Sequence, residues 1–283
     1  MKTFPVTAIT VSYGSADVLK GFFDSLHAMA PGISAVVVDN KPGADATEDV
    51  ARNAGAGYLP RPDNLGYGHA INTAVASLDS EATWLLIANP DVVWTPGALE
   101  ALVKRGESRA DIAAVGPRVV NEDGTTYPSA RAVPSFGTGV GHALLFRIWP
   151  SNPWSRRYLQ AGVDDVAREA GWLSGSCLLV RRSAFEHVGG FDEGFFMYFE
   201  DVDLGRRFKL AGMMSVYEPA AQVIHAGAHS TSRDSAQMIL EHHRSAWRFV
   251  QKRYPGIWLA PLRLLLRLGL TLRARIHARK LKR

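Results

Sequence analysis

The sequence contains a single cysteine, Cys177, among its 283 residues. One thiol cannot form an intramolecular disulfide or a cysteine-based zinc cluster, so both are excluded as ways of stabilising the fold. The chain also lacks an apolar run of the roughly 18 residues that a membrane-spanning helix needs. Its first residues, MKTFPVTAITVSYGS, are too short and interrupted for a secretory signal and are interpreted as a β-strand. These absences predict a cytoplasmic protein.

Acidic residues are missing from the C-terminal end of the chain. From His242 to Arg283 there are 12 lysines and arginines and no aspartate or glutamate, although the net charge of the whole chain is only +5. The first 241 residues therefore hold 20 basic and 27 acidic residues. The chain is an acidic body with a basic tail, and we predict a division into a catalytic domain, residues 1–240, and a helical tail, residues 241–283.

The tail mixes leucines with arginines in the stretch WLAPLRLLLRLGLTLRARIHARKLKR, residues 258–283. This pattern is typical of an amphipathic helix whose leucines enter an anionic membrane while its arginines meet the headgroups. It predicts a peripheral protein on the inner face of the plasma membrane. A helix packed on the body, with arginine stems covering apolar surface, remains an alternative. Nucleic acid is a weaker candidate, because no recognition module precedes the tail.

Apolar runs alternate with helical patterns in the N-terminal half. The runs VTAITVSY, ISAVVVDN and TWLLIANPDV are separated by segments such as ADVLKGFFDSLHAM and NLGYGHAINTAVAS. This alternation predicts an α/β fold with one main domain and a mostly parallel sheet flanked by helices. Residues 121–165, rich in Pro, Gly, Ser and Arg, are expected to form a long mobile loop.

Polar residues follow the apolar runs at the points where ligands bind in such sheets, beyond the carboxyl ends of the strands. Asp39 ends VVVDN, and Asp91 ends the sequence Asn89-Pro90-Asp91. Asp91 has the hard oxygens that Mg²⁺ or Mn²⁺ prefers. An ordinary turn or helix-capping role is about equally probable for each aspartate taken alone.

The stretch FFMYFEDVDLGRR, residues 195–207, is unusual because five aromatic or apolar residues lead directly into three carboxylates. A solvated acidic turn is not normally preceded by a run of aromatic residues. We therefore expect the segment to hold its carboxylates in fixed positions. The simpler interpretation is that Asp201 and Asp203 begin a helix, as acidic residues often do.

Six segments in this order resemble inverting family 2 glycosyltransferases of GT-A fold, and within them a rhamnosyltransferase-like branch. They are ITVSYGS, VVVDN, NLGYGHAIN, IANPDV, GSCLLVRRSAFEHVGGFDEGFFMYFEDVDLGRRFKLAG and VIHAGAHSTS. The resemblance spans roughly residues 5–235, and the GGFDE and FFMYFEDVDL segments are its most specific part.

The resemblance implies a nucleotide-sugar pocket at the first strand ends. Asp39 would accept a hydrogen bond from the pyrimidine N3–H, and the glycines Gly66 and Gly68 would let the backbone approach the ligand. The residues it implies for the nucleotide and sugar are Ser12, Tyr13, Asp39, Asn64, Gly66, Asn72 and Asn89.

It also implies a divalent cation, Mg²⁺ or Mn²⁺, on the diphosphate. The family often has Asp-x-Asp where this chain has Asn89-Pro90-Asp91, so Asp91 would be the metal ligand from that segment. His225 would complete the site, with His229 as its rival. Because Asn89 replaces a carboxylate, the resemblance does not imply that the metal is strictly required.

Asp201 matches the residue that, in this family, takes the proton of the attacking acceptor hydroxyl. Glu200 and Asp203 would keep its proton affinity high, and Asp203 would contact the acceptor or cap the following helix. Asp192, in the GGFDE segment, is expected to be structural. The residues assigned to the donor sugar or the acceptor side are Trp172, Ser174, Gly175, Glu200 and Asp203.

The resemblance therefore implies transfer of a deoxyhexose, with L-rhamnose from dTDP-L-rhamnose favoured, to a lipid-linked carbohydrate acceptor of surface polysaccharide synthesis. A donor such as a UDP-hexose is the alternative within the family. A metal-dependent phosphohydrolase could use Asp39, Asp91 and Asp201 without any acceptor. A non-catalytic sugar-binding protein would tolerate replacement of Asp201.

Overall fold

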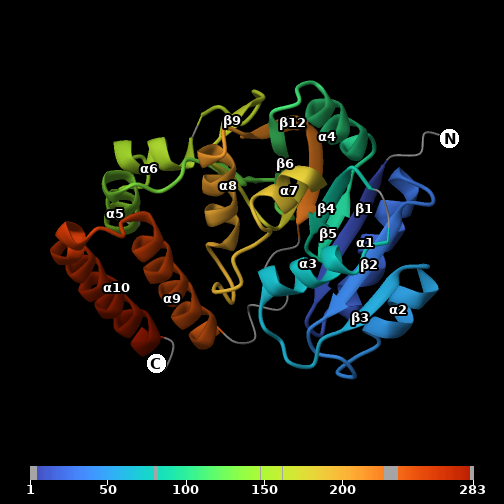
Figure 1. Ribbon diagram of the computed structural model, residues 1–283, viewed down its shortest axis with the longest axis horizontal. Coiled ribbons are helices and arrows are strands. Elements are labelled where there is room, and N and C mark those ends of the chain that lie inside the picture. Colours follow the sequence, from blue (N-terminus) through green and yellow to red (C-terminus); the bar gives the residue numbers. More distant parts are fainter. Residues whose placement is uncertain (1–4, 80–81, 147, 161, 226–234, 281–283) are drawn as a thin grey trace.

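The computed structural model describes residues 5–79, 82–146, 148–160, 162–225 and 235–280. A twisted β-sheet forms the centre of the molecule, with helices on both of its faces and two long C-terminal helices to one side (Figure 1). This arrangement confirms the expected α/β class with a mostly parallel central sheet flanked by helices.

The sheet has the strand order β3-β2-β1-β4-β11-β6-β12-β5, with β7 added beside β6 and β9 beside β12. Pairs among β1 to β4 are parallel, as is β6 with β12, whereas β11 and β5 run antiparallel to their neighbours. A separate two-stranded sheet joins β8 and β10. The strands are β1 (Val6–Ser12), β2 (Ser34–Asp39), β3 (Gly57–Pro60), β4 (Trp84–Ala88), β5 (Val92–Trp94), β6 (Ile112–Asn121), β7 (Thr126–Tyr127), β8 (Ala130–Arg131), β9 (Arg168–Ala170), β10 (Trp172–Leu173), β11 (Cys177–Arg181) and β12 (Met214–His225).

Alternation along the buried strands supplies two hydrophobic layers. In β4, Leu86 faces a cluster that also contains residues of α1, α2 and α4, whereas Leu85 and Ile87 face a cluster with residues of α3, α7 and α8. Successive strand residues point to opposite faces, so one apolar strand serves both layers. These helices are α1 (Ala16–Met29), α2 (Thr47–Asn53), α3 (Tyr67–Ala76), α4 (Ala98–Glu107), α7 (Arg182–His187) and α8 (Glu200–Leu210).

The expectation of a long loop over residues 121–165 is wrong. The segment contains β7, β8, α5 (Phe136–Leu145) and α6 (Pro153–Leu159). Helix α5 begins with a capping box between Ser135 and Thr138, and Asn152 caps α6 with Pro153 at its first turn. A capping threonine in place of the usual glutamate or glutamine, in a stretch rich in glycine, hid the first helix from a pattern-based prediction.

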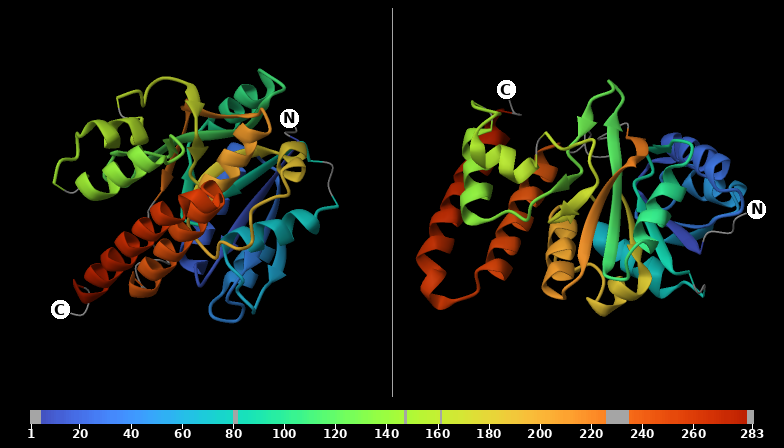
Figure 2. Two further views of the ribbon diagram at one scale, coloured as in Figure 1. Left: turned by 60° about the vertical axis from the view of Figure 1, so that its left-hand side comes forward. Right: turned by 90° about the horizontal axis from the view of Figure 1, so that it is seen from above.

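Two further helices follow β12: α9 (Ser235–Arg253) and, after the short 3₁₀ helix η1 (Ile257–Leu259), α10 (Ala260–Lys280). Helix α9 packs on the body, because Ser245, Ala246 and Phe249 are buried. The views in Figure 2 place α10 against α9 on the side away from the sheet. The predicted domain boundary at residue 240 falls inside α9, whose buried face makes it part of the body.

Within the described ranges, no helix combines the length and the apolarity that crossing a bilayer requires.

Candidate active site

A cavity of about 680 Å³ opens beyond the carboxyl ends of the central strands. Its wall combines residues that follow β1 and β4 with the segment before α8 and with α9. Its size is in the usual range for pockets that bind small molecules. The cavity is therefore at the edge of the sheet where the sequence predicted a ligand.

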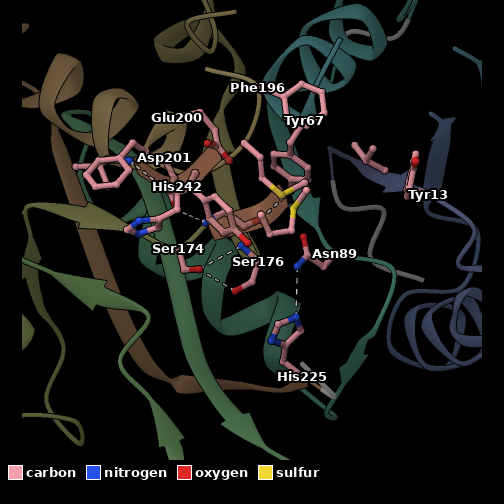
Figure 3. Close-up of a pocket in the computed structure, with 18 of the residues that line it drawn as sticks. Tyr13, Tyr67, Asn89, Ser174, Ser176, Phe196, Glu200, Asp201, His225 and His242 are labelled. Carbon is pink, nitrogen blue, oxygen red and sulfur yellow. Dashed lines mark hydrogen bonds between the residues drawn. The ribbon is translucent and has the colours of Figure 1, made fainter. Parts of the chain in front are cut away.

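At one end of this cavity, Asp91 and His225 lie next to each other (Figure 3 shows the histidine). The Nε2 atom of His225 is 3.1 Å from Oδ1 of Asp91 and 3.3 Å from Nδ2 of Asn89. The antiparallel pairing of β12 with β5 sets His225 opposite Val92, the residue after Asp91. Two residues 134 positions apart in the chain are thereby brought together, as the predicted metal pair requires.

The fit of this end to a divalent cation is partial. Among the described residues, no group of three or more His, Cys, Asp or Glu side chains is arranged to hold a metal. Asp91 is buried, and with His225 it offers one oxygen and one nitrogen ligand beside each other. Such a pair fits an ion whose remaining ligands come from a diphosphate and water. The rival ligand His229 lies outside the described residues.

At the other end of the cavity, Asp201 is fixed by two backbone hydrogen bonds (Figure 3). Its Oδ2 accepts from the Gly175 N–H at 3.0 Å, and its Oδ1 accepts from the Val202 N–H at 2.8 Å. Burial raises the pKa of Asp201, while these hydrogen bonds and the charge of Arg131 act in the opposite direction. The carboxylate is thus oriented, lines the cavity and has a higher proton affinity than an exposed aspartate.

Glu200 also lines the cavity, but only 5% of its surface is exposed. Burial, followed by the neighbouring charge of Asp201, raises the pKa of Glu200 to about 8. Its Oε2 has no hydrogen-bond partner among the described residues. The two neighbouring carboxyl groups therefore titrate as a pair, and burial disfavours ionising both at once.

The aromatic run before these carboxylates has a structural explanation. Tyr198 and Phe199 both have left-handed backbones, with φ of 68° and 67°, which is unfavourable for large side chains. Both rings pack edge-on against His242 of α9, with centroids 5.4 Å away. Phe195 is fully buried, with Phe249 of α9 in the same cluster. Packing against α9 thus holds a strained turn that aims Glu200 and Asp201 at the cavity.

The loop before α3 meets this turn at Gly66. Gly66 has φ of +103°, and an added Cβ would lie 2.2 Å from the carbonyl oxygen of Phe196. The next residue, Tyr67, donates its N–H to that carbonyl and its hydroxyl to the Gly175 carbonyl, at 2.9 and 2.8 Å. Only glycine allows this approach, so Gly66 is needed for backbone packing as well as for lining the cavity.

The residues assigned to the nucleotide divide into two groups. Tyr13, Asn64, Gly66 and Asn89 line the cavity, and Lys41 lies 5.1 Å from the centre of the Tyr13 ring. Three others, all in the described part of the chain, do not line it: Ser12, Asp39 and Asn72.

Those three side chains are occupied in structural contacts. The Ser12 hydroxyl bonds to Thr47, and Asp39 accepts hydrogen bonds from the Lys41 N–H and the Tyr58 hydroxyl. The Asn72 amide bonds to the backbone of Phe191 in both directions, which ties α3 to the GGFDE segment. In this arrangement the three residues shape the pocket from behind its wall.

On the acceptor side, Trp172, Ser174 and Gly175 line the cavity as expected. Asp203 does not, because it is fully buried and pairs with Arg207 at 2.7 Å and Lys252 at 2.6 Å. The acceptor contact considered for Asp203 therefore does not match its position, whereas a place in the first turn of α8 does.

Asp192 is structural, as expected, and its partners come from α9. It accepts from Arg248 at 2.7 Å and from Lys252 at 2.5 Å. Burial alone would raise the pKa of Asp192, but hydrogen bonds from Lys252 and Arg248 outweigh it and hold the pKa at about 2. Asp192 and Asp203 together fasten α9 to the site.

Sequence reasoning missed several cavity residues. Arg131 stands alone in a stretch taken for a loop, and His242 lies in what was counted as the tail. Other missed side chains include Tyr67, Tyr127, Tyr158 and Ser176. The aromatic character of Tyr127 and Tyr158, in an otherwise polar segment, was the only signal in the sequence.

A GT-A-like sheet with an oriented carboxylate at one end of a cavity and an Asp–His pair at the other defines a glycosyltransferase that uses a nucleotide-sugar. The comparisons with known proteins agree. The family model described as "Glycosyl transferase family 2" matches residues 7–189. The chain belongs to glycosyltransferase family 2.

Among its relatives is the N-acetylglucosaminyl-diphospho-decaprenol L-rhamnosyltransferase of Mycobacterium tuberculosis, 45% identical over 97% of this chain and 92% of the relative. Rhamnosyltransferase WbbL of Escherichia coli is 29% identical over 88% of this chain and 93% of the relative. Among solved structures, a mannosyltransferase of Pyrobaculum calidifontis, in complex with GDP-Man and Mn²⁺, aligns with a TM-score of 0.57 at 17% identity. That alignment covers 88% of this chain and 67% of the mannosyltransferase, and it shows the fold.

Proposed function

We propose that this glycosyltransferase transfers L-rhamnose, with inversion, from dTDP-L-rhamnose to a polyprenyl-diphosphate-linked N-acetylglucosamine in cell-surface polysaccharide synthesis. The donor and acceptor are suggested by the mycobacterial relative, which matches nearly the whole chain. The observation that carries the chemistry is Asp201, which two backbone N–H groups hold at the wall of the cavity.

In the proposed reaction, an acceptor hydroxyl attacks the anomeric carbon of rhamnose from the face opposite the nucleotide. The new C–O bond forms as the bond from that carbon to the diphosphate oxygen breaks, and the electron pair leaves with the diphosphate. Asp201 takes the hydroxyl proton. Burial raises its pKa and so strengthens it as a base, while the backbone hydrogen bonds from Gly175 and Val202 favour its ionised form.

Asp91 and His225 would hold a divalent cation at the opposite end of the cavity. Bound there, the cation would neutralise charge on the departing diphosphate. Asn89, beside His225, would offer its amide to the ribose or sugar hydroxyls. Tyr13, Asn64 and Gly66 would border the nucleotide and sugar, while Ser12, Asp39 and Asn72 would support that wall from behind.

We also propose that the tail lies on an anionic membrane, where a polyprenyl-linked acceptor resides. Its support is the surface of η1 and α10, where Trp258 is 92% exposed and Ile257 is 73% exposed. Leu264, Leu265 and Leu268 of α10 are also exposed, and Arg263 and Arg267 lie among them. Exposed apolar side chains next to basic ones are typical of interfacial helices.

The test is transfer to a soluble analogue in which N-acetylglucosamine is linked through diphosphate to a short alkyl chain. We expect rhamnosylated product from dTDP-L-rhamnose and much less product from UDP-hexoses. The product should carry the anomeric configuration opposite to that of the donor. Release of nucleotide at the same rate with and without acceptor would instead favour a hydrolase.

A further inference from the structure

Arg131 is the only lysine or arginine among the described residues that line the cavity. The carboxyl groups in that wall are those of Asp91, Glu200 and Asp201. A family 2 transferase must bind a diphosphate on its donor, and the proposed acceptor brings a second one. The cavity must therefore bind two diphosphate groups, and Arg131 is the one side chain with a permanent positive charge among the described residues that line it.

The guanidinium of Arg131 is held by aromatic rings. Its Cζ lies 5.1 Å from the centre of the Trp172 ring, 5.2 Å from that of Tyr127 and 5.9 Å from that of Tyr158. Its Nε donates to the Pro128 carbonyl at 2.6 Å. Cation–π contacts of this kind stabilise a guanidinium in a desolvated place and fix its orientation.

No carboxylate of the described chain lies within ion-pair distance of Arg131. Two other partly buried arginines have one: Arg207 pairs with Asp203, and Arg248 pairs with Asp192. The phenol of Tyr158 is the further polar neighbour of Arg131. The terminal nitrogens of Arg131 are thus available to an anion, for which a planar guanidinium is well suited.

The position of Arg131 relates it to the acceptor rather than to the donor. Strand β8 pairs with β10 so that Arg131 is opposite Trp172, three residues before Gly175, whose N–H holds Asp201. Asp201 and Arg131 each perturb the other's pKa through their charges. The proposed place of the donor diphosphate is at His225 and its neighbour Asp91, and His225 lies across the cavity from Asp201 (Figure 3).

We propose that Arg131, in the cage formed by Tyr127, Tyr158 and Trp172, binds the diphosphate of the lipid-linked acceptor and so positions its sugar hydroxyl beside Asp201. This inference rests on the proposed function for the nature of the acceptor. The attacking hydroxyl and the diphosphate of such an acceptor are on one sugar ring, so one wall must hold both the base and the cation. Arg131 is a positioning residue that binds the anion and takes no proton.

The first experiment compares two acceptor analogues with the same sugar and alkyl chain, one linked through diphosphate and one a neutral glycoside. The wild-type enzyme should prefer the diphosphate analogue. In Arg131→Met that preference in kcat/KM should fall by about 10- to 100-fold, as expected for a lost hydrogen bond between charged groups, and mainly through KM. Any effect on Asp201 cancels in the ratio, because both analogues use the same base at the same pH.

Arg131→Lys should retain part of the preference, because lysine keeps the charge without the planar fork. The matched control is Arg181→Met. Arg181 also stacks on an aromatic ring, 4.3 Å from the centre of Trp84, and binds backbone carbonyls, but it does not line the cavity. An unchanged preference in Arg131→Met, or an equal loss in Arg181→Met, would overturn the proposal.

The second experiment needs no transfer and separates this inference from the proposed function. Geranyl diphosphate is titrated by calorimetry into enzyme saturated with dTDP, so that the donor site is filled. The wild type and Arg181→Met should bind it equally, and Arg131→Met should bind it at least about 10-fold more weakly. If this holds while no rhamnose is transferred, the inference stands and the proposed substrates fall. If geranyl diphosphate fails to bind the wild type, or binds Arg131→Met equally well, the inference falls.

Discussion

Asp201 accepts a hydrogen bond of 3.0 Å from the backbone N–H of Gly175, a residue 26 positions earlier in the chain. The carbonyl of the same Gly175 accepts a hydrogen bond from the hydroxyl of Tyr67. One glycine therefore connects the carboxylate, the turn after β10 and the first residue of α3. This connection fixes the carboxylate before any substrate arrives, and it makes the role of Asp201 testable by a substitution that keeps the side-chain shape.

Asp201→Asn should reduce turnover by about 10²-fold or more, because the amide cannot accept the hydroxyl proton. Donor binding should change little, since Asp201 lies across the cavity from His225 (Figure 3), which is 3.1 Å from Asp91. Steady-state kinetics and calorimetry with dTDP measure the two effects. The exposed Asp24→Asn is the control. Turnover close to wild type in Asp201→Asn would remove the residue from the mechanism.

Glu200→Gln should stabilise the protein, and more so at alkaline pH. The pKa of Glu200 rises from 4.5 to about 8 on folding, so the folded state loses stability as pH rises between these values. Glutamine removes that penalty, and we expect a gain of about 1 kcal/mol or more at pH 9 over that at pH 5. Urea unfolding at both pH values measures it.

The exposed Glu122→Gln serves as the control for this measurement. A gain in Glu200→Gln that is the same at pH 5 and pH 9 would show that burial does not raise the pKa of Glu200.

Asp91→Ala should weaken dTDP binding mainly when Mn²⁺ is present, because the substitution removes one of the two side chains proposed to hold the ion. Titration of dTDP with and without Mn²⁺ measures the difference, and Asp123→Ala is an exposed control. His225→Ala should behave like Asp91→Ala. A loss of the same size with and without metal would point to a mechanism that needs no cation.

Gly66→Ala should lower both stability and activity, because the added Cβ would lie 2.2 Å from the Phe196 carbonyl in a left-handed backbone. Gly97→Ala is the matched control, since Gly97 also has a positive φ, of +80°, but nothing lies within 4 Å of its added Cβ. Thermal unfolding should show a larger loss for Gly66→Ala. Equal losses in the two variants would show that the positive φ, and not the contact with Phe196, causes the effect.

Removal of the chain after Pro255 should abolish binding to anionic liposomes and leave transfer to a soluble analogue intact. The removed segment holds eight basic residues and no acidic one, and those that reach a membrane surface contribute about 1 kcal/mol each. Liposome sedimentation at low salt, with release as ionic strength rises, measures this attraction.

The double substitution Ile257→Gln and Trp258→Gln separates the two parts of that attraction. It keeps every charge but removes the two most exposed apolar side chains of η1. Binding should become weaker and more sensitive to salt. If the truncated chain sediments as well as the full chain, the tail is a packing element.

The N-terminal half of the fold was predictable because each of its buried strands is a continuous apolar run with polar residues at its end. That pattern also placed Asp91 and Asn89 at the cavity. The pairing of β11 and β12 into the same sheet was not predictable, since strands distant in sequence combine through register. The proximity of Asp91 and His225 came from family resemblance, and the register of β12 on β5 explains it.

Some predicted residues lie outside the cavity wall and some cavity residues were missed, because contacts between distant parts of the chain decide both. Asp39 and Asn72 have the predicted residue types, but their side chains bond to Tyr58 and to the distant Phe191 backbone instead of lining the cavity. Arg131 was invisible because its cage is assembled from Tyr127, Tyr158 and Trp172, which share no periodicity in the chain. Composition made the tail look separable, although the buried face of α9 joins it to the site.

Helix α9 contributes Gln237, Met238 and His242 to the cavity wall and is fastened by Lys252. A chain that emerges from the ribosome folds from its N-terminus. The strand ends after β1, β2 and β4 can therefore form early, while the wall opposite them waits for the synthesis of α9. A nascent chain would be able to recognise a nucleotide before it has a complete acceptor wall. Sugar transfer is thus reserved for chains that have been translated through α9.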